Sequence, residues 1–158
     1  MLITLTLWLA SLRAERLRRD DGVRLASRRG RVASPDGFDG EQVLADASRR
    51  FVRLQAAWDA RDLGLLKSLT TPDLYDDLCH VIAACETAGA TRTDVISLHA
   101  ELLGLEQVGA AWLASVEFSG LIRESTDAGA VPFRELWMLA ADPAADPGWR
   151  LARQQALL

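Results

Sequence analysis

The feature that most constrains the fold is a change in the spacing of apolar residues near residue 90. Before this point apolar residues recur every three or four positions, as on one face of an α-helix. After it they alternate with polar residues, as in strands that bury one face. Helices followed by alternating strands are typical of α+β proteins, in which the helices cover one face of an antiparallel sheet. We therefore expect three helices packed on a curved four-stranded antiparallel sheet.

The first predicted helix spans residues 41–59. Its apolar stripe follows the helical spacing and consists of Val43, Ala47, Phe51, Leu54 and Trp58. Three arginines fall on or near the outer face of this helix, namely Arg49, Arg50 and Arg53. A long amphipathic helix of this kind is expected to bury its stripe against the sheet.

Two shorter helices are predicted to follow. Asp62 is a suitable N-cap for a helix over residues 63–69. Thr71 and Pro72 then fit the cap and the first position of a third helix. Gly89 is expected to end this third helix, whose predicted buried stripe is Leu74, Leu78, Val81, Ile82 and Cys85. The two cysteines, Cys79 and Cys85, are six residues apart on this helix, which makes a disulfide between them geometrically implausible.

The strand half of the chain shows alternating burial. The first strand is expected to bury Ile96, Leu98, Ala100 and Leu102. The second is expected to bury Trp112, Ala114, Val116, Phe118 and Ile122. The third strand covers residues 131–141, and a turn over residues 142–148 leads to the last strand. Phe133 and Trp137 share their face with Glu135. This face is therefore either open to solvent at its edge or carries a buried carboxylate, and we expect the first, because an unpaired buried charge is costly.

Charge divides the chain into two parts. Residues 1–34 carry eight arginines and three acidic residues, which is a net charge of +5. Because the whole chain has a net charge of −4, the remaining residues together carry −9. We divide the chain into a basic arm and linker (1–40) and a folded domain (41–158). A basic arm on an acidic body indicates contact with a negative surface; the alternative is a solvated leader. The membrane-contact candidates are Trp8, Arg13, Arg16, Arg18, Arg19, Arg28, Arg29 and Arg31.

The first twelve residues form an apolar run, "MLITLTLWLASL". The run is shorter than the roughly 20 residues of a spanning helix, and its positive charges follow rather than precede it, unlike those of a signal peptide. It fits an interfacial amphipathic helix; the remnant of a longer membrane segment and an unstructured terminus are the alternatives.

Four pieces of the sequence, in order, resemble one family. They are "FVRLQAAWDARDLGLLKSLTTPDLYDDL" (51–78), "VEFSGLIRE" (116–124), "PFRELW" (132–137) and "GWRLA" (148–152). Together they resemble the Tim-forty-four-like domain family, named after the C-terminal domain of the mitochondrial import-motor scaffold. The resemblance implies a cone of helices over a twisted sheet, cystatin-like and similar to nuclear-transport-factor-two-like domains. It also implies a peripheral membrane-associated binding domain with an apolar pocket, affinity for acidic lipid and no enzymatic activity.

The aromatic residues of the domain are either plain core or the wall of a ligand pocket, since aromatic side chains dominate core energetics. The pocket candidates are Trp58, Tyr75, Trp112, Phe118, Phe133 and Trp137. The two histidines, His80 and His99, match no catalytic or zinc-binding spacing. We therefore expect no catalytic residue, no metal and no cofactor.

The predicted function is that of a non-enzymatic membrane-associated scaffold or ligand-binding domain. Its expected partner is an anionic membrane surface or lipid, with a protein partner possible in addition; the net negative charge argues against nucleic acid. The expected location is peripheral, on the cytoplasmic face of a bacterial inner membrane, with a soluble cytoplasmic protein as the alternative. Two other functions stay open: a ketosteroid-isomerase-like enzyme that uses Tyr75 with Glu117 or Glu135, and a ribosome- or protein-interaction module.

Overall fold

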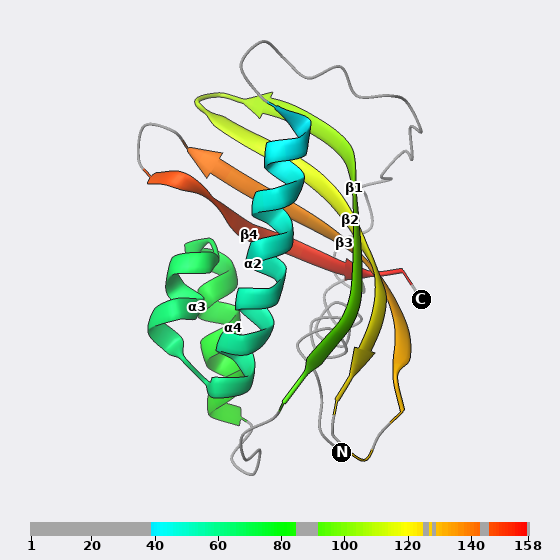
Figure 1. Ribbon diagram of the computed structural model, residues 1–158. Coiled ribbons are helices and arrows are strands. Elements are labelled where there is room, and N and C mark those ends of the chain that lie inside the picture. Colours follow the sequence, from blue (N-terminus) through cyan, green and yellow to red (C-terminus); the bar gives the residue numbers. More distant parts are fainter. Residues whose placement is uncertain (1–38, 85–91, 125–126, 128, 143–145, 158) are drawn as a thin grey trace.

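The computed structural model describes residues 39–84, 92–124, 127, 129–142 and 146–157. Three helices are followed by four strands, as expected, and they are α2 (Gly40–Ala60), α3 (Leu63–Leu69), α4 (Pro72–Ala84), β1 (Asp94–Val108), β2 (Ala111–Arg123), β3 (Val131–Asp142) and β4 (Asp146–Ala156). The strands form one sheet in the order β1-β2-β3-β4, and every neighbouring pair is antiparallel. Figure 1 shows the helices on one face of this curved sheet. The predicted α+β fold is therefore confirmed.

Some sequence predictions fall outside the described residues. They concern the apolar run, Trp8 and all the arginines of the arm, together with Cys85 and Gly89. Within the described residues, no helix has both the length and the apolar character that crossing a membrane requires.

Helix α2 buries the predicted stripe. All five apolar positions from Val43 to Trp58 are buried. At the start of the helix, the side chain of Asp39 accepts a hydrogen bond from the amide of Glu41 at 3.0 Å, which satisfies one of the free amides of the first turn. At the end, Arg61 has the left-handed φ of 56° that commonly stops a helix. Arg61 also lies 4.6 Å from the ring centre of Trp58, a favourable cation–π distance.

Helices α3 and α4 are joined to the edge of strand β4. Asp62 caps α3 as predicted, because its side chain accepts a hydrogen bond from the amide of Leu65 at 3.0 Å. Between the two helices, the amide of Thr71 donates to the carbonyl of Leu151 on β4 at 3.0 Å. Pro72 is the first residue of α4, where its missing N–H costs nothing. The helix pair therefore covers the β4 side of the sheet.

Strand β1 departs from the predicted alternation at Ile96. Residues Val95 and Ser97 pair with consecutive residues of β2, so that Ile96 forms a bulge. The bulge shifts the side-chain alternation by one position, because the extra residue has no partner on the facing strand. Ile96 was predicted to be buried; this prediction is wrong, and the side chain is 49% exposed. Val95 takes its place against the core, while Leu98, Ala100 and Leu102 pack there as predicted.

Gly120 on β2 pairs with Leu98, two residues after the bulged Ile96. A Cβ at this position would come within 2.0 Å of the carbonyl oxygen of Ser97, and the φ of Gly120 is +153°. Only glycine fits such a close approach of two backbones. The bulge and the glycine together bend the sheet around the helices.

Phe51 of α2 is at the centre of the core. Its ring centre lies 4.8 Å from that of Phe118, 5.4 Å from that of Phe133 and 4.9 Å from that of Trp137. These distances are within the favourable range for aromatic pairs. The aromatic face of strands β2 and β3 is therefore covered by α2.

Glu135 also faces this core, contrary to the prediction of an edge open to solvent. Its side chain has an exposed fraction of 0%. The Nε1 of Trp137 donates a hydrogen bond to Oε2 of Glu135 at 2.7 Å, and the side-chain amide of Gln154 on β4 donates to the same oxygen. Burial of the carboxyl group is possible because these two donors accompany it.

Candidate functional site

The structure places the six predicted pocket residues in two environments. Trp58, Phe118, Phe133 and Trp137 are buried in the core around Phe51. Tyr75 on α4 and Trp112 on β2 are half-buried and pack against the outside of that core. Two hollows described below are lined by other residues. A role for the six aromatic residues in ligand binding stays a prediction.

Tyr75 has a polar neighbourhood on the surface of α4. A hydrogen bond with the side chain of Cys79 raises the pKa of the Tyr75 hydroxyl above its ordinary value. The Nζ of Lys67 on α3 lies 6.0 Å from the ring centre. The free thiol of Cys79 is half-buried at this place. Tyr75 therefore links α3 and α4 and keeps its proton at neutral pH.

The other ionisable candidates lie on different elements. His80 is exposed on α4, and His99 is exposed on β1. Glu117 of β2 pairs with Arg134 of β3, with an oxygen–nitrogen distance of 2.7 Å. Among the described residues, no three histidine, cysteine or acidic side chains gather in a way that could hold a metal ion.

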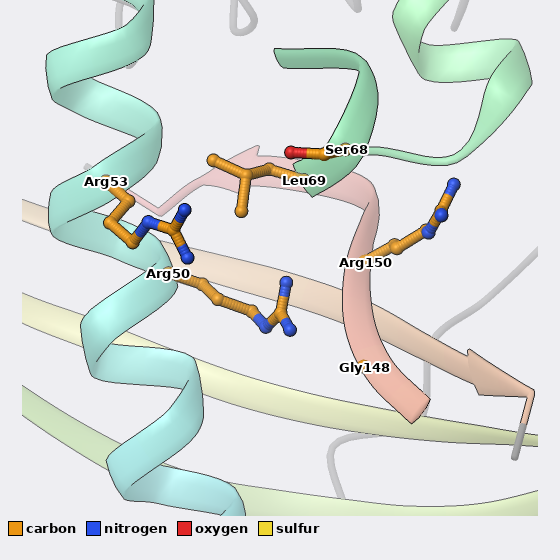
Figure 2. A pocket seen from close by; sticks show the side chains of 6 residues that line it. All are labelled: Arg50, Arg53, Ser68, Leu69, Gly148 and Arg150. Atoms are coloured by element: carbon orange, nitrogen blue, oxygen red, sulfur yellow. The ribbon is translucent and has the colours of Figure 1, made fainter. Parts of the chain in front are cut away.

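A basic hollow of about 220 Å³ opens between α2, α3 and β4. Six residues line it, and we call their site the basic hollow: Arg50, Arg53, Ser68, Leu69, Gly148 and Arg150. Figure 2 shows Arg50 and Arg53 reaching from α2 towards β4, with Arg150 on the opposite wall. Arg50 and Arg53 thus reach towards the hollow from α2, while Arg150 lines its β4 wall with a side chain that extends away from these two arginines.

Gly148 makes room for one of these arginines. A Cβ on Gly148 would lie 2.6 Å from a terminal nitrogen of the Arg50 guanidinium. Since such a distance is closer than van der Waals contact, the Arg50 side chain lies directly over the glycine backbone. A side chain at residue 148 would therefore displace the end of the Arg50 side chain.

The basic hollow was not predicted from the sequence. Arg50 and Arg53 were expected on or near the outer face of the first helix, where their spacing of three residues does place them side by side. Arg150 lies a hundred residues away in the chain, and the helix pattern carries no information about which strand comes near. The sequence signal for this hollow was a pair of arginines beside the buried stripe of the first helix, together with a glycine and an arginine in the last strand.

A second hollow, of about 440 Å³, lies between α2 and the free edge of β1. Apolar and polar residues both line it, including the exposed Val52 and Ile96 together with Gln55, Thr93 and Asp94. The hydroxyl of Thr93, one of the lining residues, donates a hydrogen bond to the carboxylate of Asp59 on α2 at 3.1 Å. This hollow is larger and less charged than the basic hollow.

Comparison with known proteins gives the family. The description "Tim44-like domain" matches residues 27–156, more than four-fifths of the chain. The chain belongs to the Tim44-like domain family. This finding confirms the resemblance seen in the sequence, and the Tim44-like match includes every described helix and strand.

No curated protein matches the chain. Two solved structures resemble the fold of this Tim44-like domain. One is a ketosteroid isomerase-like protein from Erwinia carotovora atroseptica SCRI1043, with 14% identity and a TM-score of 0.43, over 77% of this chain and 99% of that chain. The other is the intermembrane space region of the chloroplast protein ARC6, with 11% identity and a TM-score of 0.49, over 76% of this chain and 97% of that chain. At these values neither structure bears on the activity of the Tim44-like domain described here.

Proposed function

We propose that this chain is a non-enzymatic scaffold or ligand-binding domain that acts at an anionic membrane surface. The observation that carries the proposal is the Tim44-like match over residues 27–156. The charge distribution supports it, because a +5 arm precedes a body with a charge of −9. Each arginine close to an anionic membrane contributes about 1 kcal/mol of attraction. The peripheral location on the cytoplasmic face of a bacterial inner membrane is part of this proposal.

The environment of Glu135 supports a binding role rather than catalysis. A ketosteroid-isomerase-like reaction needs a carboxyl group that meets its substrate in a cavity. Glu135 is buried against Trp137 and Gln154, and Glu117 pairs with Arg134 on the other face of the sheet. Tyr75 and Trp112, the half-buried aromatic candidates, are the positions where we propose contact with an apolar ligand.

Vesicle flotation of the full chain tests the membrane role. The protein is mixed with phosphatidylcholine vesicles or with vesicles containing cardiolipin, at low and at high salt. We expect flotation only with the anionic vesicles and release by salt, because screening weakens attraction between exposed charges. A variant with Arg13, Arg16, Arg18 and Arg19 changed to glutamine should lose most of this binding. Arg49→Gln, which removes an exposed charge of α2, is the control and should float like the wild type.

Two outcomes would contradict the proposal. The membrane role is wrong if the full chain floats with neither kind of vesicle. The electrostatic mechanism is wrong if the chain floats equally with neutral vesicles at high salt.

A further inference from the structure

We propose that the basic hollow binds the phosphate group of an anionic ligand. The site consists of Arg50 and Arg53 of α2 and Arg150 of β4, around a space of about 220 Å³. This site lies in the folded domain and is separate from the basic arm. It can therefore be tested independently of the membrane role proposed above.

The charge of the lining residues is the first argument. None of the six residues that line the hollow is acidic, although the whole chain has a net charge of −4. The positive charges of Arg50 and Arg53, which both reach from α2 towards the hollow, attract an anion. Guanidinium groups also form paired hydrogen bonds whose geometry matches the oxygens of phosphate.

The support of the arginine stems is the second argument. Arg50 precedes Phe51, whose ring is buried between α2 and the face of the sheet, next to Trp137 of β3. Arg150 lies between Trp149 and Leu151, which are both buried. Because their neighbours are fixed in the core, the backbones of the two arginines are held on opposite walls of the hollow.

The donors of these arginines are sufficient for a ligand. Arg50 and Arg150 also interact with other parts of the chain. A guanidinium group has five N–H donors, so that it can bind an anion and a partner in the chain at the same time. Arg53 is exposed and adds a third group from the same face of α2 as Arg50.

The size of the hollow limits the ligand. Pockets for whole drug-sized ligands have volumes of about 300–1,000 Å³. A hollow of about 220 Å³ is below this range and therefore accommodates one small group rather than a large organic molecule. The phosphate could belong to a soluble phosphorylated compound or to a lipid headgroup, and the experiment separates these two sources.

The test uses inorganic phosphate and the full chain. Phosphate is titrated at constant ionic strength, with chloride as the comparison anion, and binding is followed by the NMR signals of the backbone amides. The amides of Gly148 and Leu69 are local reporters, so that binding of phosphate to the arm does not obscure the result. We expect these signals to move with phosphate and not with chloride.

Two kinds of variant make the test specific. Arg53→Gln should weaken phosphate binding at Gly148 by about tenfold, since it removes a charge-assisted hydrogen bond. Arg150→Gln should weaken binding by a smaller factor, since it removes a positive charge from the wall of the hollow. Arg49→Gln, on the same helix but outside the hollow, should leave it unchanged. Gly148→Ala should also weaken binding, because the new methyl group displaces the end of the Arg50 side chain. Gly129→Ala is its control, because a Cβ there meets no atom within 4 Å.

Vesicle flotation of the same variants then identifies the source of the phosphate. A headgroup ligand requires that Arg53→Gln and Arg150→Gln reduce flotation with phosphatidylglycerol vesicles while Arg49→Gln does not. A soluble ligand requires that both variants float normally but no longer bind inorganic phosphate. The proposal is overturned if the amides near Gly148 respond equally to chloride and phosphate, or if the hollow variants bind phosphate like the Arg49→Gln control.

Discussion

Phe51 is the residue that joins helix α2 to the aromatic face of the sheet. Its ring contacts those of Phe118, Phe133 and Trp137. We expect Phe51→Ala to lower the free energy of unfolding by about 3–5 kcal/mol, the usual cost of removing a buried phenylalanine ring. Val52→Ala is a matched control on the next residue, which is 48% exposed, and it should change stability by less than about 0.5 kcal/mol. Urea unfolding measures both; equal effects would contradict the assignment of Phe51 to the core.

Glu135 contributes to stability through its partners rather than by its own burial. In Glu135→Ala the donors of Trp137 and Gln154 lose their acceptor in the core. Each buried donor left without a partner costs about 1–3 kcal/mol. We therefore expect Glu135→Ala to destabilise by about 2–4 kcal/mol, and Glu135→Gln by less, since the amide oxygen can still accept.

Thermal and urea unfolding distinguish these two variants. Glu117→Gln is the control, because Glu117 lies on the other face of the sheet, paired with the exposed Arg134. If Glu135→Ala were no more destabilising than Glu117→Gln, the hydrogen bonds to Glu135 would have no net effect on stability.

The residues also explain which parts of the structure could be predicted from the sequence. The stripe from Val43 to Trp58 was predicted correctly, because helical spacing depends only on residues close in the chain. The burial of Glu135 was not, because its partner Gln154 comes from a strand nineteen residues away. The basic hollow was missed for the same reason, since Arg150 meets Arg50 and Arg53 only after folding.

At the scale of secondary structure elements, strand β1 begins with an ion pair that ties it to β2. The carboxylate of Asp94 lies 3.1 Å from Arg123 and 3.2 Å from Arg92. Hydrogen bonds from Arg123 and then from Arg92 hold the pKa of Asp94 below its ordinary value. A lowered pKa in the folded state means that the ionised carboxylate favours folding. This contribution is present above the pKa of the unfolded chain and is lost as the pH falls through the pKa of the folded state.

The pH dependence expected for the Asp94→Asn variant follows from the lowered pKa of Asp94 in the folded state. We expect the variant to unfold at a lower temperature than the wild type near pH 7. The difference should shrink below about pH 4, where carboxylates begin to take up protons. Calorimetric melting at several pH values measures it, with the exposed Asp73→Asn on α4 as the control. A difference in melting temperature that is constant from pH 7 to pH 3 would contradict the role of the ionised carboxylate.

The bulge at Ile96 marks the limit of what strand patterns predict. Alternation identified the first two strands and the buried face of β2, because that strand keeps its register with β3 throughout. In β1 the register changes at Val95/Ser97 and again at Leu102/Gly104. A sequence with a period of two gives no sign of an inserted residue unless the facing strand is known, and here the facing residues are Leu121 and Ile122.

At the scale of the whole molecule, stability is expected to be uneven between the sheet and the α3–α4 side. Strands β2 and β3 are each paired on both sides, and α2 buries eight residues. Helix α4 buries only Leu74, Leu78 and Val81, and two of these side chains keep 8% exposure. Segments with few buried contacts open locally at a lower free energy than the whole domain.

Native-state hydrogen exchange therefore should show two levels of protection. We expect the amides of β2 and β3 to exchange only by global unfolding, and those of α4 to exchange earlier, by local opening. Leu78→Ala removes a buried side chain of α4 and should speed exchange in α4 further. In this variant, the free energy of local opening of α4 should stay below the free energy at which β2 and β3 open, because α2 still packs on the sheet. If α4 and β2 exchanged at one common free energy, the domain would unfold as a single cooperative unit.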